Sequence, residues 1–260
     1  MEKHVKYFEK NEKGRDFVVG DIHGCLDELE EELKILSFDY NKDRLFSVGD
    51  IADRGPKSYE CLMLMFEPWF HPVKGNHEIL LYDAHRRKEK VNKLVFLQNG
   101  GEMINEYDPN YDKILDKIVE LPYIIEIESK SGKKVGILHA EVPPNISDWE
   151  LLKRKVINSK SIDEQLNLFN RNIDLEVLVW GNHRISKYRR QQHKQRIYPD
   201  IVGIDLIYVG HTIVPEAVLF EKHYYIDTGC FLPHWISEHK LETQKKRGYI
   251  NPKLTVMEIE

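Results

Sequence analysis

The 260-residue sequence has few cysteines, no long apolar run and no excess of basic residues. Its three cysteines, Cys25, Cys61 and Cys230, are an odd number at wide spacing, which excludes a disulfide framework and a zinc-knuckle pattern. We interpret them as small buried hydrophobic residues of a protein in a reducing cytoplasm. A reactive role stays open for Cys230, which lies near a candidate site.

The other absences concern membranes and nucleic acids. The longest obvious apolar run, Cys61–Phe66, is far shorter than the ~20 residues that cross a bilayer, and the first six residues contain no apolar signal core. The net charge of −5 argues against a dedicated nucleic-acid binder, which is usually basic. We expect a cytoplasmic protein without membrane contact, built as one domain over residues 1–260. The sequence leaves its oligomeric state unknown.

Three stretches of the chain begin with apolar residues and end in glycine followed by Asp, Asn or His. They are residues 16–24, 44–56 and 71–78. This pattern is typical of buried parallel strands that carry polar ligands at their C-terminal ends. The intervals between Asp21, Asp50 and Asn76 are each close to the ~30 residues of one βαβ crossover. We therefore expect the three motifs to be neighbours at one edge of a sheet, where ligands of α/β folds bind.

The distribution of apolar residues along the chain predicts alternating strands and helices first and a β-rich part afterwards. Leucines at helical spacing indicate the helices, and runs in which apolar and polar residues alternate indicate the strands. Serines 147 and 161 are candidate N-caps, and about 186–200 is a basic loop or insertion. The order predicts an α/β (α+β) fold of two packed mixed sheets flanked by helices. The expected strands are 17–20, 45–48, 71–74, 123–129, 134–139, 176–180, 206–209, 224–227 and 254–259; the expected helices are 25–36, 57–66, a helix beginning within 78–88, 110–119, 147–158 and 162–170.

Nine polar residues fall at the predicted strand ends. The set is rich in His, Asp and Asn and lacks Cys, so it suits Mn, Fe or Zn but not a structural zinc site. It is large enough for two ions, and a paired site needs one bridging carboxylate, for which Asp50 is the natural candidate. Metals ~3.5–4 Å apart can share a hydroxide nucleophile. The nine residues are Asp21, His23, Asp50, Asp53, Arg54, Asn76, His77, His139 and His211.

Each of these residues also has an ordinary structural explanation. Asp21 and Asp50 could be helix N-caps, Asp53 and Arg54 could form a local salt bridge, and a lone histidine is more often structural than a ligand. These explanations do not account for three motifs together. In the chemical interpretation, the bidentate fork of Arg54 holds a phosphate and a histidine that is not a ligand protonates the leaving alkoxide.

The motifs resemble those of the phosphoprotein phosphatase family of metallophosphoesterases, in particular its lambda-phage and bacterial type. The resemblance covers most of the chain and is specific, because many motifs match in order. They are Val18–Cys25, Ser47–Asp50, Asp53–Gly55, Pro68–Phe70, Gly75–Glu78, Asn99–Gly101, Leu121–Pro122, His139–Ala140, Gly210–Thr212 and Tyr225–Gly229.

The resemblance implies a calcineurin-like metallophosphoesterase fold with two divalent ions, Mn²⁺ first and Fe or Zn as alternatives. It implies in-line hydrolysis without a phosphoenzyme. It also assigns the ligands: Asp21 and His23 to the first metal, Asp50 to both, and Asn76, His139 and His211 to the second.

The resemblance further implies that His77 is the general acid, oriented by Asp53, and that Arg54 and Asn76 hold the substrate phosphate. One departure concerns a second phosphate clamp, which the family usually places two residues after a Trp. Here Trp180 is followed at that distance by Asn182, and Arg184 comes two residues later. Arg184 is therefore a candidate substitute. The basic residues 187–196 could line a substrate groove, although a solvated loop is the simpler interpretation.

The expected function is hydrolysis of phosphoserine or phosphothreonine in proteins. The motivation is Asp53 before Arg54 and Gly55, because symmetrical diadenosine tetraphosphate hydrolases look similar but typically carry Ala there. A phosphoesterase acting on RNA or nucleotides is a further alternative. A catalytically silent scaffold that binds phosphorylated partners is disfavoured, because all the inferred ligands are present.

Overall fold

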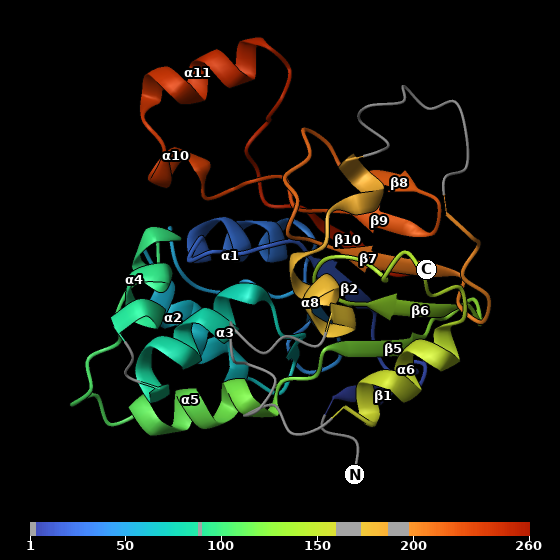
Figure 1. Cartoon of the computed structure of the whole chain (residues 1–260). Helices are drawn as coiled ribbons and strands as arrows, with labels where there is room; N and C mark the ends of the chain where they lie inside the picture. Colours follow the sequence, from blue (N-terminus) through green and yellow to red (C-terminus); the bar gives the residue numbers. More distant parts are fainter. Residues whose placement is uncertain (1–3, 88–89, 160–172, 187–197) are drawn as a thin grey trace.

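The computed structural model describes residues 4–87, 90–159, 173–186 and 198–260 (Figure 1). Its smaller sheet has the order β10-β2-β3-β4. The three glycine-ended motifs of the sequence, residues 16–24, 44–56 and 71–78, lie on and after its parallel strands. These strands are β2 (Asp16–Val19), β3 (Arg44–Ser47) and β4 (Phe70–Pro72). Val19 pairs with Ser47, which pairs with Pro72, so the three strands end at one edge as predicted. The edge strand β10 (Val256–Glu258) runs antiparallel to β2.

The larger sheet has six strands in the order β1-β5-β6-β7-β9-β8. It is mixed, because the hairpin β5–β6 and the pair β8–β9 are antiparallel while β1–β5, β6–β7 and β7–β9 are parallel. Its strands are β1 (Val5–Phe8), β5 (Ile124–Glu128), β6 (Lys134–Ile137), β7 (Leu206–Val209), β8 (Val218–Phe220) and β9 (His223–Tyr225).

The core between the sheets follows the period-two alternation of the strands. Val18 and Phe46 of the smaller sheet join Ile125 and Ile137 of the larger sheet in one buried cluster. Phe17, the neighbour of Val18, belongs instead to the cluster on the helical side. Alternate residues of a strand point to opposite faces, so a fully apolar strand such as β2 is buried on both.

Helices cover the outer faces of the two sheets (Figure 1). Among the described residues, no helix has the length and apolar character needed to cross a bilayer. The helices are α1 (Leu26–Ile35), α2 (Ser58–Met63), the 3₁₀ turn η1 (Leu64–Phe66), α3 (Asn76–Tyr82), the π-helical turn η2 (Asp83–Arg87), α4 (Lys90–Gln98), α5 (Tyr111–Glu120), α6 (Trp149–Ile157), α8 (Ile173–Trp180), α10 (Leu232–Trp235) and α11 (Glu238–Lys246).

Most predicted elements are confirmed within a few residues, but three predictions were wrong. The segment 176–180 is the end of helix α8 and not a strand, because a short apolar run does not distinguish a buried strand from a buried helix. Helix α3 begins at Asn76, before the expected range. The N-cap of α6 is Asp148, whose side chain accepts the Leu151 N–H, and not Ser147. The predicted helix 162–170 and its candidate cap at 161 lie outside the described residues.

Candidate metal centre and active site

The backbone bends sharply where the strands of the smaller sheet end. Positive φ angles occur at His23 (45°), Asp50 (50°), Asp53 (75°) and Arg54 (71°), and also at His211 (63°) after β7. Such angles are uncommon for residues other than glycine and are retained where surrounding structure enforces them, often at functional sites. Of the seven non-glycine residues with positive φ among the described residues, these five were all selected from the sequence, and the other two are Ser37 and Glu221. Most of this backbone strain therefore lies where the motifs predict chemistry.

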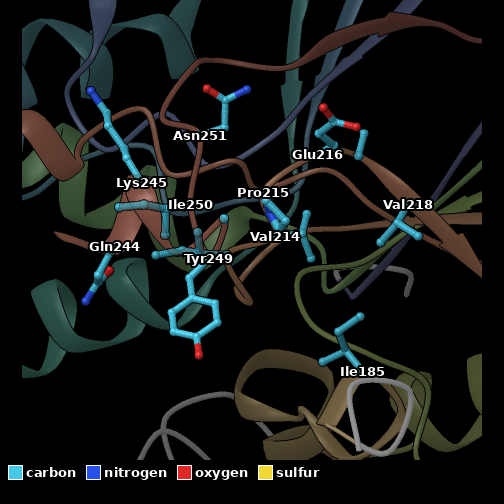
Figure 2. A pocket seen from close by; sticks show the side chains of 13 residues that line it. Ile185, Val214, Pro215, Glu216, Val218, Gln244, Lys245, Tyr249, Ile250 and Asn251 are labelled. Carbon is cyan, nitrogen blue, oxygen red and sulfur yellow. The ribbon is translucent and has the colours of Figure 1, made fainter. Parts of the chain in front are cut away.

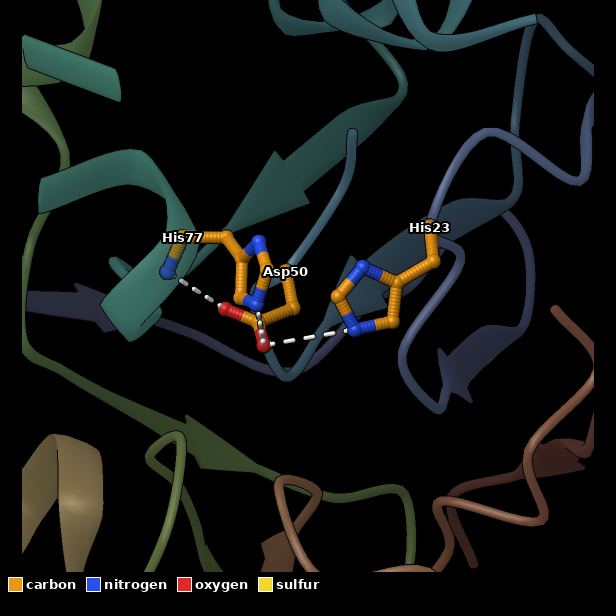
Figure 3. Close-up of side chains that lie close together, drawn as sticks. All are labelled: His23, Asp50 and His77. Carbon is orange, nitrogen blue, oxygen red and sulfur yellow. Dashed lines mark hydrogen bonds and ion pairs between the residues drawn. The ribbon is translucent and has the colours of Figure 1, made fainter. Parts of the chain in front are cut away.

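Asp50 lies at the middle of two groups of metal-ligand side chains. Its Oδ2 is 3.4 Å from His23 Nε2 and 4.0 Å from His77 Nε2 (Figure 3). On its other side, Oδ1 is 3.4 Å from His139 Nε2. The second group also contains His211. One carboxylate with an oxygen toward each group is the arrangement of a bridging ligand between two ions.

Asn76 completes the second group. Its Oδ1 lies 2.8 Å from His139 Nε2 and 2.9 Å from His211 Nδ1. Asp21 is buried beside the same loop, where its carboxylate accepts the backbone N–H of His211 at 3.0 and 3.1 Å. The structure therefore brings all six predicted ligands to one edge, although they arise from both sheets.

The histidines of the centre are held in the form that binds metal. The Nδ1–H of His23 donates to Ala52 O at 2.9 Å, and that of His139 donates to Val48 O at 2.7 Å. These bonds leave the Nε2 lone pairs facing Asp50. Burial lowers the pKa of His139 to about 3 and that of His211 to about 3, so both imidazoles are neutral near pH 7. Neutral imidazole is the ligand form.

The carboxylates of the centre also fit divalent cations. The pKa of buried Asp21 is raised well above its usual value, first by burial and then by the negative charges of Asp227 and Asp50. Such a crowd of carboxylates is stabilised by cations placed between them. Gly75 leaves the space open, since a Cβ there would collide with Asp50 Oδ1. With oxygen and nitrogen donors only, the residues suit Mn, Fe or Zn.

His77 and Asp53 form a second functional unit. His77 Nδ1 lies 2.7 Å from Asp53 Oδ2, and both side chains are buried. Asp53 is itself held by the Glu102 N–H, which donates to Oδ1 at 3.2 Å. Burial lowers the pKa of His77 to about 4, opposed by the charge of Asp50. The carboxylate fixes the ring so that Nε2 faces the metal-ligand groups. With this pKa the ring is neutral near pH 7, with Nδ1–H toward Asp53 and Nε2 accepting from Arg54 Nη2, so His77 acts as an acid only after it takes up a proton at Nε2.

Arg54 extends across the same space. Its Nη1 is 2.9 Å from His23 Nε2, and its Nη2 is 2.8 Å from His77 Nε2. The guanidinium packs between two rings, with its carbon 4.7 Å from the centroid of Phe231 and 4.6 Å from that of Trp235. Aromatic contacts of this kind stabilise a cation and orient its plane. Both nitrogens of the fork thus point into the centre.

Three contributors were missed in the sequence. Glu78 accepts the backbone N–H groups of Gly75, Asp50 and Ile51 at 2.8, 3.0 and 2.8 Å, and so fixes the loop that carries Asp50. Its spacing from Gly75 is that of a capping box, which could have indicated this role. Phe231 and Trp235, which hold Arg54, gave no such local signal.

The structure does not bring Arg184 to the centre. Its side chain is fully buried in an ion pair with Glu221, and its Nε–H donates to Val142 O at 3.3 Å. Its backbone N–H donates to Glu141 at 2.9 Å. Asn182, at the usual clamp position, is exposed. The basic residues 187–196 lie outside the described residues.

One wall of a pocket of 1290 Å³ is the segment that starts at Ile213, two residues after His211. Its walls are formed by Ile213–Val218, by Ile185, and by residues 244–245 and 248–251, with Lys245 and Glu216 on different walls (Figure 2). This volume exceeds the ~300–1,000 Å³ of common small-ligand pockets. None of the predicted ligands lines this pocket, although the segment that carries His211 leads into its wall.

Comparison with known families agrees with this geometry. A profile described as calcineurin-like phosphoesterase matches residues 17–215. The chain belongs to this family. The resemblance noted in the sequence and the predicted fold are therefore confirmed, and the candidate ligand groups correspond to the divalent-metal chemistry of calcineurin-like phosphoesterases.

Several members of the calcineurin-like phosphoesterase family are similar along most of their length. Serine/threonine-protein phosphatase 1 of Salmonella typhimurium is 31% identical over 82% of this chain and 86% of its own. Serine/threonine-protein phosphatase 2 of the same organism is 33% identical, with 87% and 92% covered. A symmetrical bis(5'-nucleosyl)-tetraphosphatase of Pasteurella multocida is 26% identical, with 84% and 71% covered.

Solved structures of this family share the fold. A protein serine/threonine phosphatase from Saccharomyces cerevisiae superposes with a TM-score of 0.56 at 15% identity, over 100% of this chain and 84% of that one.

Proposed function

We propose that this phosphoesterase is a metal-dependent phosphatase of phosphoserine and phosphothreonine in proteins. The observation that carries the proposal is the 2.7 Å contact between His77 Nδ1 and Asp53 Oδ2, beside two ligand groups that share Asp50. Serine and threonine alkoxides are poor leaving groups, so their esters need a positioned acid. The relatives named serine/threonine-protein phosphatases support the same substrate class.

In this proposal Asp21, His23, Asp50, Asn76, His139 and His211 hold two divalent ions, of which Mn²⁺ is the first candidate and Fe or Zn the alternatives. Bound ions of this kind supply a nucleophilic hydroxide and neutralise phosphate charge. Arg54 places two N–H groups on the phosphate, a bidentate arrangement that its aromatic neighbours keep in plane. Asn76 lies beside the same oxygens, and His77 gives a proton from Nε2 to the leaving alkoxide while Asp53 holds Nδ1–H.

A second candidate is symmetrical hydrolysis of dinucleoside tetraphosphates. The similar tetraphosphatase of Pasteurella multocida and the large pocket after His211 both favour it. Asp53 argues against it, because Asp53 positions His77 as an acid. A phosphate leaving group needs such an acid much less than the alkoxide of serine or threonine does.

The test is phosphate release by metal-stripped protein after addition of Mn²⁺. A phosphoserine protein, a phosphothreonine protein and diadenosine tetraphosphate are compared by kcat/KM. We expect rapid release from the phosphoproteins and little cleavage of the dinucleotide. The reverse preference would move the assignment to nucleotide hydrolysis. Absence of turnover on all three, despite bound metal, would instead favour a phosphate-binding scaffold.

A further inference from the structure

A separate group of ligand-type side chains lies outside the predicted dinuclear centre. The side chains of Cys25, Glu28 and His234 place a thiol, a carboxylate oxygen and a ring nitrogen within 4.8 Å of one another. Cys25 is the N-cap of α1 and Glu28 lies in its first turn, whereas His234 is on α10. Glu28 and His234 are 206 residues apart in the sequence, and Figure 1 shows α10 above the end of α1.

A second thiol, that of Cys230, lies beside Cys25 but outside this group. Contact with the Cys25 thiol and burial raise the pKa of Cys230 well above its usual value, so this thiol stays protonated. Its S–H donates to the backbone oxygens of Asp21 and Ile22, each at 3.4 Å. Cys230 is therefore a buried neighbour of the group, at the base of the loop that carries the predicted ligands Asp21 and His23, and not one of its ligands.

We propose that Cys25, Glu28 and His234 form a binding site for one thiophilic divalent ion, with zinc as the chemical model. One sulfur, one nitrogen and one oxygen, with a fourth tetrahedral position left for water, are a donor set that zinc accepts. The dinuclear centre lacks thiols, so the two sites differ in the metals that they select. This inference does not depend on the proposed phosphatase activity.

The ligand atoms of the group need to move only slightly closer together to bind one ion. Bonds of 2.0–2.3 Å in a tetrahedron separate ligand atoms by roughly 3.3–3.8 Å. His234 Nε2 and Glu28 Oε1 are already 3.5 Å apart. The wider separations between ligand atoms, up to 4.8 Å, must shorten by about 1 Å, which rotation of the side chains allows. Glu28 and His234 have the freedom for this, because their side chains are 39% and 36% exposed, and they give the ion a route from solvent.

An ion at this site would tie α10 to α1 next to the phosphate-binding group. Trp235 follows His234 on α10 and lies 4.6 Å from the Arg54 guanidinium. Phe231, on the same segment, packs 4.4 Å from the His23 ring. Fixing His234 therefore fixes the rings that orient Arg54. The site is a positioning site for the centre and not a part of the predicted catalytic machinery.

Cobalt distinguishes this site from the dinuclear centre. Co²⁺ bound by thiolate has an intense charge-transfer band in the near ultraviolet, which nitrogen and oxygen ligands do not produce. We expect reduced wild-type protein titrated with Co²⁺ to develop this band and to bind one ion more than His234→Ala. Both His234→Ala and Glu28→Gln should lose the band and about tenfold or more of the cobalt affinity of this site.

His239→Ala, an exposed histidine on α11, is the matched control and should keep the full band. The cluster variants change partly exposed side chains, so they leave the buried core intact; circular dichroism verifies folding. A wild-type protein without the band at saturating Co²⁺ would overturn the proposal. So would a band that keeps its intensity in both His234→Ala and Glu28→Gln.

Discussion

The predicted metal centre and the surroundings of Arg184 both bury charged side chains, but they satisfy those charges differently. In the centre, Asp21, Asp50 and Asp227 lie close enough for burial and mutual repulsion to raise the pKa of Asp21. Around Arg184, the charges pair within the protein: Arg184 binds Glu221, and Glu141 accepts the N–H groups of His183 and Arg184 at 2.7 and 2.9 Å.

This difference in how the charges are satisfied distinguishes the predicted metal centre from the ion pair of Arg184, which supports the fold. Buried carboxylates without protein cations are stable only when protonated or bound to metal. The Arg184 side chain is fully buried, with Nη1 paired to Glu221 and Nε donating to Val142 O, and its Nη2 is enclosed without a hydrogen-bond partner among the described residues. None of its donors faces solvent where a substrate could reach it, and removal of either partner of the ion pair is costly. We infer that Arg184 supports the fold and does not replace the clamp missing at Asn182. The predictions below test the two halves of this comparison.

The largest effect is expected at the shared ligand. Asp50→Asn removes the charge that both ligand groups use and costs several kcal/mol of transition-state stabilisation, equivalent to about 10³-fold or more in kcat/KM. Metal content per chain should fall with it, as measured by mass spectrometry of the dialysed protein. Asp39→Asn, a partly exposed turn residue that is not among the predicted site residues, is the control and should retain both. Full metal content and activity in Asp50→Asn would refute the bridging role.

The acid role of His77 is tested with two leaving groups. His77→Asn should lower kcat on a phosphoserine peptide about 10²–10⁴-fold, because the alkoxide needs a proton. On p-nitrophenyl phosphate, whose leaving group is stable as an anion, the loss should be much smaller. Asp53→Asn, which leaves the ring unoriented, should cost about 10–100-fold on the peptide. Equal losses on both substrates would show that His77 serves the metals and not the leaving group.

The Arg184 half of the comparison predicts a change in stability without a change in chemistry. Arg184→Met removes the buried cation that neutralises Glu221, so the free energy of unfolding in urea should fall by about 3–5 kcal/mol. The double variant Arg184→Met/Glu221→Gln should recover part of this loss. The KM for p-nitrophenyl phosphate should stay close to the wild-type value. A sharp rise in that KM with unchanged stability would restore Arg184 as a phosphate clamp.

The smallest effect concerns a histidine outside both clusters. His71 packs 4.7 Å from Phe8, and burial together with the charges of Lys6 and Arg44 lowers its pKa to about 3. The unfolded chain binds a proton below the ordinary pKa of ~6.5 while the native state does not, so this histidine removes stability as the pH falls from ~6.5 toward 3.

Between about pH 7.5 and pH 5, His71 should therefore contribute a loss of about 1–2 kcal/mol in the free energy of unfolding. His71→Gln should lose less stability than the wild type over this interval, as measured by urea unfolding at both pH values. If the free energy of unfolding changed equally with pH in both proteins, His71 would not be the source of the acid sensitivity.

The strand-end motifs could be predicted from the sequence because they are local. Gly-Asp and Gly-Asn-His each combine a strand that is apolar on both faces with a turn that only particular backbone angles allow, and the crossover length fixes their order at one edge. These local motifs indicate Asp21, His23, Asp50, Asp53, Asn76 and His77 as site residues, whereas the division of the ligands between two metals and the pairing of His77 with Asp53 follow from the family resemblance.

Tertiary structure decided what depends on distant contacts. Whether the run ending at Trp180 is helix or strand, whether Arg184 meets a phosphate or Glu221, and which histidine meets Cys25 are all set by packing between segments far apart in the chain. Periodicity and spacing describe only the neighbours of a residue along one element. A side chain's partner across the core is chosen by the way that whole sheets and helices fit together, which no single motif records.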